Sequence, residues 1–153
     1  MQQYQMIRGS RGVVLSFAEE HLAHQLHTPV PAFVNKTIAY LLVHNINVYL
    51  HWMANFAMQL GEEYADENSF QDIAGIKVLY AKTDRIVADF IMRYHNGLHE
   101  TIIGTTISGR QEQLTPLEIF THVITHEFHH KGQLLSMFRL LGQTPPDSDV
   151  IRF

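Results

Sequence analysis

The sequence predicts an all-α protein, an antiparallel four-helix bundle in which residues 1–153 form a single domain. Four segments carry apolar residues at helical spacing, and turn signals separate them. The 153 residues are enough to bury a core without disulfides. Hydrophobic residues make up 46% of the chain and charged residues 17%, a balance typical of globular domains.

The first two predicted helices are separated by prolines. The first covers about Ser10 to Gln25 and stops before Thr28-Pro29-Val30-Pro31, because neither proline can continue a helix. The second begins near Asn35, a favourable N-cap, and ends near Leu60-Gly61. Its apolar side chains recur every three or four residues, which predicts one buried face: Ile38, Leu41, Leu42, Ile46, Tyr49, Met53 and Phe56.

The last two predicted helices have well-marked ends. The third covers about Ile73 to His95 and stops at Asn96-Gly97. The fourth begins at Thr115-Pro116-Leu117-Glu118, which combines an N-cap threonine, a proline at the first helical position and a glutamate at the third. We expect this helix to extend to about Leu141, since Gly142 follows.

Residues 98–114, between the third and fourth helices, favour a short β-hairpin. Thr101 to Ile107 is rich in β-branched residues, and Ser108-Gly109 is a turn signal. Two isolated strands are marginally stable, so we expect the hairpin to pack on the helices.

Composition and charge exclude several classes of function. The net charge is −4 and the eleven lysines and arginines are scattered, so we expect no nucleic-acid partner. The chain has no cysteine, which excludes disulfides and thiolate ligands. The first fifteen residues lack the apolar region of a signal peptide, and the apolar runs are too short to span a bilayer. We therefore expect a soluble, cytoplasmic protein with no membrane partner.

Histidines are unusually concentrated near the end of the chain. Four of the eleven lie within nine residues: His122, His126, His129 and His130. His126 and His130 are one helical turn apart, offset by about 40° around the axis. Apolar residues share that face, so it points inward, and the two imidazoles can bind one metal ion together. Two buried imidazoles without a shared partner would leave several polar nitrogens unsatisfied.

A catalytic transition-metal site usually has three protein ligands and one open position. His44 is the best candidate for the third ligand, because it lies on the apolar stripe of the second helix. His51, seven residues further on, is the reserve. A single histidine on an apolar face is more often a hydrogen-bonded core residue, so His44 taken alone favours that interpretation.

The segment His126-Glu127-Phe128-His129-His130 also spells HExxH, the signature of zincin proteases. In a zincin the glutamate is the general base, and a third ligand follows downstream. The 23 residues after His130 contain neither histidine nor glutamate, and Gln133 stands where the extended signature has glycine. We therefore favour a solvated Glu127, or one that orients a ligand, and give the zincin interpretation little weight.

Three segments give the chain a resemblance to the DinB/YfiT-like superfamily. Leu41-Leu42-Val43-His44, followed by Trp52, resembles the segment that holds the family's first ligand. The residues from His126 to Gln133 resemble its H-x-x-x-H-(R/K)-G-Q signature. The segment from Leu141 to Asp147 resembles its usual tail.

The resemblance implies an up-down-down-up four-helix bundle that is often a homodimer. It also implies a site of three histidines, here His44, His126 and His130, that holds zinc or nickel, with manganese or iron as alternatives. Lys131 stands where many members have arginine, and its ammonium lacks the bidentate geometry of a guanidinium fork.

These observations lead to two main functional hypotheses. The first is a metal-dependent enzyme, either a transferase that uses a low-molecular-weight thiol such as bacillithiol or mycothiol, as in some members of the superfamily, or a hydrolase. The base of this enzyme could be His129, His51 or Glu127. His122 is expected either at the surface or in contact with a metal ligand.

The second hypothesis is a non-catalytic metal-binding or stress-response bundle. A helical bundle without metal is a third interpretation. The substrate and the native metal stay open, because metal binding depends on availability as well as on ligands.

Overall fold

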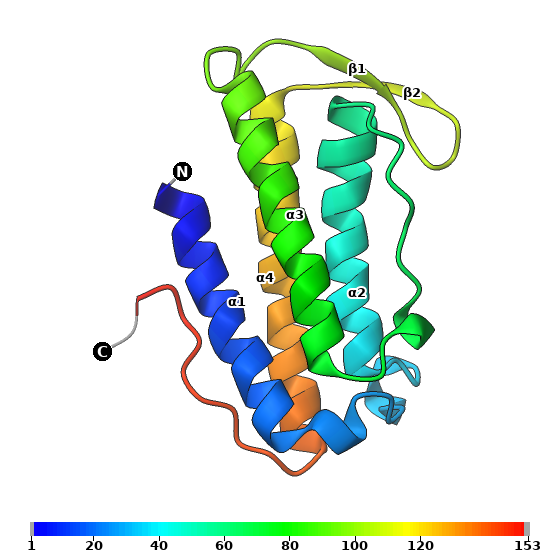
Figure 1. The fold of residues 1–153 in the computed structure, drawn as a ribbon, viewed down its shortest axis with the longest axis vertical. Coiled ribbons are helices and arrows are strands. Elements are labelled where there is room, and N and C mark those ends of the chain that lie inside the picture. Colours follow the sequence, from blue (N-terminus) through cyan, green and yellow to red (C-terminus); the bar gives the residue numbers. More distant parts are fainter. Residues whose placement is uncertain (1, 152–153) are drawn as a thin grey trace.

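The computed structural model describes residues 2–151 and contains, within them, the four long helices that the sequence predicts (Figure 1). They are α1 (Gln2–His21), α2 (Ile38–Tyr49), α3 (Ile73–Tyr94) and α4 (Pro116–Leu140). Single 3₁₀ turns lie in the connections: η1 (Ala23–Gln25), η2 (Pro31–Phe33) and η4 (Glu67–Ser69). α1 and α4 run in one direction, and α2 and α3 in the other. This confirms the up-down-down-up bundle.

α1 begins at Gln2, not at Ser10 as predicted, and it ends at His21, before the predicted Gln25. Tyr4 and Ile7 are both 4% exposed and extend the buried stripe of the helix towards the N-terminus. Because most helical stability in proteins comes from packing, their burial outweighs the poor helix propensity of Gly9 and Gly12.

The N-cap of α2 is Thr37, not Asn35. The Thr37 hydroxyl oxygen accepts a hydrogen bond of 3.0 Å from the Tyr40 amide. Asn35 instead has φ 59° and belongs to the preceding tight turn with Val34. An asparagine tolerates this left-handed conformation, so the residue type that suggested a cap serves the turn.

α2 continues into a segment of wider turns, η3 (Leu50–Ala57). These turns are of the π type, in which an amide bonds to the carbonyl five residues earlier; the Met58 amide donates to the Met53 carbonyl at 3.1 Å. Each residue therefore advances less around the axis than in an α-helix. In this segment His51 bonds to the Tyr64 hydroxyl, and the ring of Trp52 lies 5.3 Å from that of His122 in α4.

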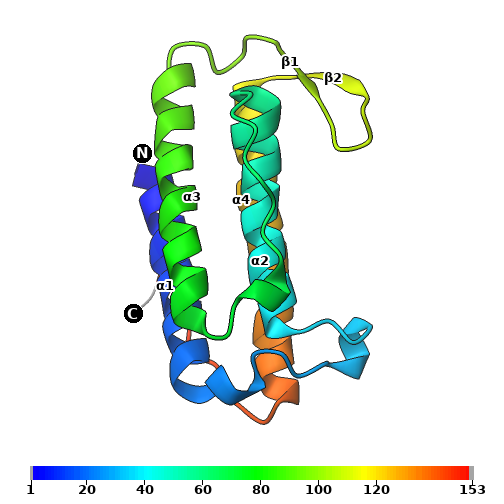
Figure 2. The same cartoon turned by 45° about the vertical axis from the view of Figure 1, so that its right-hand side comes forward.

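The predicted hairpin is present as β1 (Ile102–Thr105) and β2 (Gln111–Leu114), which pair antiparallel with Ile102 opposite Leu114. It crosses the end of the bundle over η3 (Figure 2). Gly104 is buried against Phe56, and a Cβ there would lie 2.6 Å from the Phe56 carbonyl oxygen. The hairpin can approach the helix this closely because residue 104 has no side chain.

The core lies between the four helices, with α2 packed against both α3 and α4, and α1 against the same two. Its largest fully buried side chains include Tyr49, Phe56, Phe90 and Phe138. Within residues 2–151, none of the helices combines the length and the apolar character required to cross a bilayer.

We predict that Gly104→Ala destabilises the protein by about 1–3 kcal/mol, because the added methyl group overpacks the contact with Phe56. Gly12→Ala is the matched control, since a Cβ there meets nothing within 4 Å and the residue lies within α1. It should stabilise by about 0.5–1 kcal/mol. Chemical denaturation measures both free energies of unfolding. Equal stability of the two variants would contradict the close packing.

Candidate metal centre

α2 and α4 together bring three histidines to one point on their shared face. His126 and His130 occupy successive turns of α4, and His44 faces them from α2. One ring nitrogen from each lies within 4.8 Å of the other two. The ring centroids are 4.4 Å apart for His126 and His130, 4.8 Å for His44 and His130, and 5.1 Å for His44 and His126. The structure therefore brings together the three histidines that the sequence selected, which could hold a metal ion.

The three imidazoles are neutral near pH 7. Burial lowers the pKa of His44 and His130. Burial, reinforced by the neighbouring histidines, lowers the pKa of His126 to about 4. A neutral imidazole keeps the lone pair that a metal ion requires, so protons do not compete for these three ligand nitrogens near pH 7.

His126 also has an unsatisfied nitrogen. Its Nδ1 is buried and finds no hydrogen-bond partner among residues 2–151. Buried polar atoms are nearly always paired in native proteins, so such an atom needs an explanation. The donor set fits a divalent transition metal, for which imidazole is a common ligand.

Gln133 orients the ring of His130. The Nδ1–H of His130 donates to the Gln133 amide oxygen at 2.6 Å, because that oxygen can only accept. The Gln133 amide nitrogen then donates to Nε2 of His129 at 3.2 Å. This leaves Nε2 of His130 as an acceptor. Sequence reasoning did not assign this role, although the three-residue spacing of His130 and Gln133 on a helix is a signal for it.

The other nearby histidines lie outside the group of three. His51, the reserve ligand, forms a hydrogen bond of 2.9 Å with the Tyr64 hydroxyl. The exposed His122 lies with its ring centroid 5.7 Å from that of His126. His129 is also exposed, with its ring 5.0 Å from that of His130.

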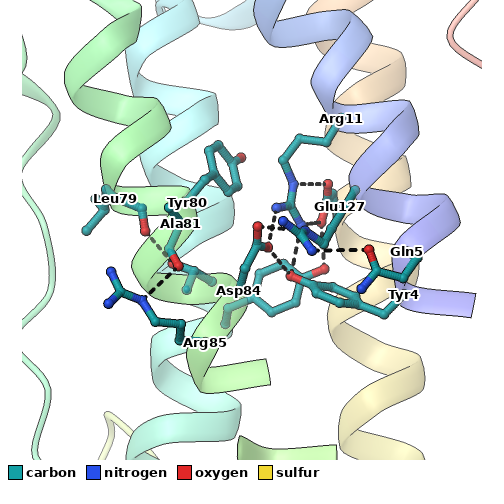
Figure 3. Close-up of polar contacts among 12 residues, drawn as sticks. Tyr4, Gln5, Arg11, Leu79, Tyr80, Ala81, Asp84, Arg85 and Glu127 are labelled. Atoms are coloured by element: carbon teal, nitrogen blue, oxygen red, sulfur yellow. Dashed lines mark hydrogen bonds and ion pairs between the residues drawn. The ribbon is translucent and has the colours of Figure 1, made fainter. Parts of the chain in front are cut away.

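Glu127 is buried in the core, so the expectation that it is solvated is wrong. It is only 6% exposed. Arg11 of α1 binds both its oxygens, through Nε to Oε1 at 2.8 Å and through a terminal nitrogen to Oε2 at 3.0 Å (Figure 3). The Tyr49 hydroxyl donates to Oε2 at 2.5 Å. Because both oxygens of Glu127 already accept hydrogen bonds from these partners, its carboxylate is not suited to act as the general base of a zincin.

The ion pair extends into a network that reaches all four helices. A terminal nitrogen of Arg11 binds Asp84 of α3 at 2.7 Å, and the Tyr4 hydroxyl donates to the same oxygen at 2.6 Å (Figure 3). The guanidinium carbon lies 4.4 Å from the centre of the Tyr80 ring. Burial raises the pKa of Tyr49, and the charge of Glu127 raises it further. Tyr49 therefore stays a neutral hydrogen-bond donor.

Lys131 turns towards the C-terminal tail. Its Nζ donates to the Ser148 carbonyl at 2.9 Å and to the Ser10 hydroxyl at 3.2 Å. The Ser10 hydroxyl in turn donates to the Ser148 carbonyl at 2.6 Å. A single ammonium is sufficient for these contacts, which hold the tail alongside α1 (Figure 1).

Comparison with known proteins identifies the family and agrees with the fold. The DinB family model matches residues 1–153. The chain belongs to the DinB family. Its fold is similar to the crystal structure of a DinB-like protein, YjoA, from Bacillus subtilis, with a TM-score of 0.66 and 20% sequence identity over 95% of this chain and 97% of that one. At this identity the likeness extends to the fold alone. No curated protein matches this DinB family chain.

Replacing Arg11 should test the importance of the buried ion pair. We predict that Arg11→Met costs about 3–5 kcal/mol, because it leaves Glu127 buried without its counter-ion. Arg8→Ala removes another arginine from Asp84, but the Arg8 side chain is 43% exposed, so the loss should be below about 1 kcal/mol. Denaturation of both variants gives the comparison. Similar losses would show that the Arg11 pair contributes no more than a surface contact.

Acidification should destabilise the metal-free protein through His126. Its pKa is about 4 when folded, against an ordinary value of 6.5, so between these values the unfolded state takes up a proton that the folded state does not. The stabilising contribution is complete above about pH 6.5 and is lost as the pH falls towards 4. His126→Gln should flatten this part of the stability–pH curve, measured with a chelator present. Parallel stability–pH curves for the two proteins would refute the lowered pKa of His126.

Proposed function

We propose that His44, His126 and His130 bind one divalent transition-metal ion, and that this DinB family protein is a metal-dependent enzyme. The observation that carries the proposal is the convergence of three neutral imidazoles, without a fourth ligand residue in the group among residues 2–151. Three protein ligands with an open position are typical of catalytic sites, whereas structural sites are closed.

The geometry needs only small adjustments to receive an ion. Zinc–nitrogen bonds of about 2.0–2.1 Å place tetrahedral ligand atoms about 3.3 Å apart. The three nitrogens already lie within 4.8 Å, so modest rotations of the rings are enough. Zinc and nickel are the expected ions, with manganese or iron as alternatives, and homodimerisation stays a prediction.

His44 and His126 are only half-buried, which supports the proposal that a small molecule can reach the three histidines from solvent. A divalent ion held there would supply the positive charge that favours deprotonation of a thiol or a water molecule near neutral pH. Gln133 keeps the His130 ring in place, and the exposed His129 lies beside that ring at the rim of the site. We therefore propose thiol S-transfer, with a low-molecular-weight thiol, or hydrolysis as the reaction type.

The alternative is a non-catalytic metal-binding or stress-response protein. It requires a fourth side chain on the ion, and His122 is the nearest histidine to His126 outside the triad. Loss of metal affinity in His122→Ala would favour this alternative, because the proposed enzyme site does not use His122 as a ligand.

Activity should depend on the metal. With a thiol and an alkyl halide as substrates, we expect zinc- or nickel-loaded protein to exceed both the chelated protein and His126→Ala by a factor of about 100 or more, in line with electrostatic terms at active sites. His24→Ala, which changes an exposed histidine in η1, is the control and should keep full activity. Hydrolysis of an activated ester is assayed in parallel. Equal rates for metal-loaded and metal-free protein in both assays would refute the enzyme proposal.

Gln133 should contribute to metal affinity through His130. Gln133→Leu removes the acceptor for Nδ1–H, so we expect metal affinity to fall by about 10–100-fold. Gln133→Glu keeps an acceptor and should retain the affinity. Competition with a chelating dye measures both. Unchanged affinity in Gln133→Leu would exclude the orienting role.

A further inference from the structure

A pocket beside the triad is formed by η3, the end of β2 and the first turns of α4. Its volume is about 200 Å³. It is lined by Trp52, Leu114, Glu118, Ile119 and His122. Pockets that enclose a whole drug-sized ligand usually measure about 300–1,000 Å³, so this one is suited to part of a small molecule, such as one ring.

His122 is the wall between the pocket and the triad. Its ring centroid lies 5.3 Å from that of Trp52, inside the pocket, and 5.7 Å from that of His126. The ring of His122 is therefore what separates a molecule in the pocket from the proposed metal position.

The walls of the pocket come from η3, the hairpin and α4, and the first two of these contribute no residue to the triad. The wide turns of η3 carry Trp52 towards α4, where its ring packs 4.6 Å from that of His51 and 5.4 Å from that of Phe56. Phe56 also receives Gly104, which docks the hairpin and so brings Leu114 to the pocket. The walls are thus held from three separate segments, which makes the pocket largely preformed.

The lining indicates an aromatic occupant. Trp52 and His122 present flat rings at an interplanar angle of 72°, and Leu114 and Ile119 are aliphatic. Neither the indole N–H nor the His122 ring forms a hydrogen bond to the chain within residues 2–151, so both are available to a ligand. The Glu118 carboxylate already accepts bonds of 2.7 and 2.8 Å from Thr115, and its negative charge disfavours an anion.

We propose that this pocket binds an uncharged five- or six-membered aromatic ring of the substrate, with the reacting group directed towards the triad. The direction of the reacting group rests on the proposed metal site, whereas binding of the ring does not. The substrate class is therefore an aromatic or heteroaromatic compound with its reactive substituent on or next to the ring.

Trp52 is the only tryptophan in the chain and lines this pocket, so its fluorescence is a probe for a molecule bound there. Benzyl alcohol is the probe, and cyclohexylmethanol is its saturated match. We expect a saturable change with benzyl alcohol in metal-free and zinc-loaded protein, and at least fivefold weaker binding of cyclohexylmethanol. Leu114→Glu, which places a charge in the pocket, should weaken binding at least tenfold. Leu117→Glu changes an exposed leucine outside the lining and should bind as the parent does.

A second measurement places the ring relative to the triad. Mn²⁺ bound to the three histidines should broaden the proton NMR signals of bound benzyl alcohol, and His126→Ala should abolish the broadening. Absence of saturable fluorescence change, equal binding of the two alcohols, or no broadening despite bound Mn²⁺ would each overturn the proposal. If the protein binds no metal but Leu114→Glu still abolishes ring binding, the pocket stands and the metal-dependent function fails.

Discussion

Arg11 and Glu127 meet inside the bundle, where each charge is shielded from water and requires the other as its partner. The pair sets the rotation of α4 about its own axis. With Glu127 directed at α1, His126 and His130 are displaced by about 100° and 60° around the helix, both to the same side. That side faces α2, where His44 lies. The geometry of the triad therefore follows from a contact in which none of its members takes part.

The partners of this ion pair come from every helix of the bundle. Tyr4 and Arg11 belong to α1, Tyr49 to α2, Asp84 to α3 and Glu127 to α4. A shift in the register of any helix would leave a buried charge or hydroxyl without its partner, at a cost of several kcal/mol. We infer that the network contributes more to the choice of one packing arrangement than to net stability, because desolvation offsets much of the attraction.

Local spacing made much of the site predictable. His126 and His130 follow from a four-residue interval on an apolar face, and His44 from its place on the stripe of α2. The buried charges were also detectable, since Arg11 and Glu127 both occupy stripe positions, in the series Tyr4, Ile7, Arg11, Val14 and the series Val123, Glu127, Leu134. Because the first helix was predicted to begin at Ser10, Tyr4 and Ile7 were not assigned to the first series. By contrast, η3 packs against the hairpin and α4, and no local pattern encodes these contacts, so the position of Trp52 against α4 could not be foreseen.

The most direct test of the metal centre is X-ray absorption spectroscopy at the zinc edge, on protein prepared without a histidine tag and loaded with zinc. We expect one ion per chain with three imidazole nitrogens at about 2.0–2.1 Å and at least one further light ligand that is not histidine. Replacement of His44 by alanine should reduce the imidazole count by one. A fourth imidazole, or a spectrum that does not change on loss of His44, would contradict an open site built from these three histidines.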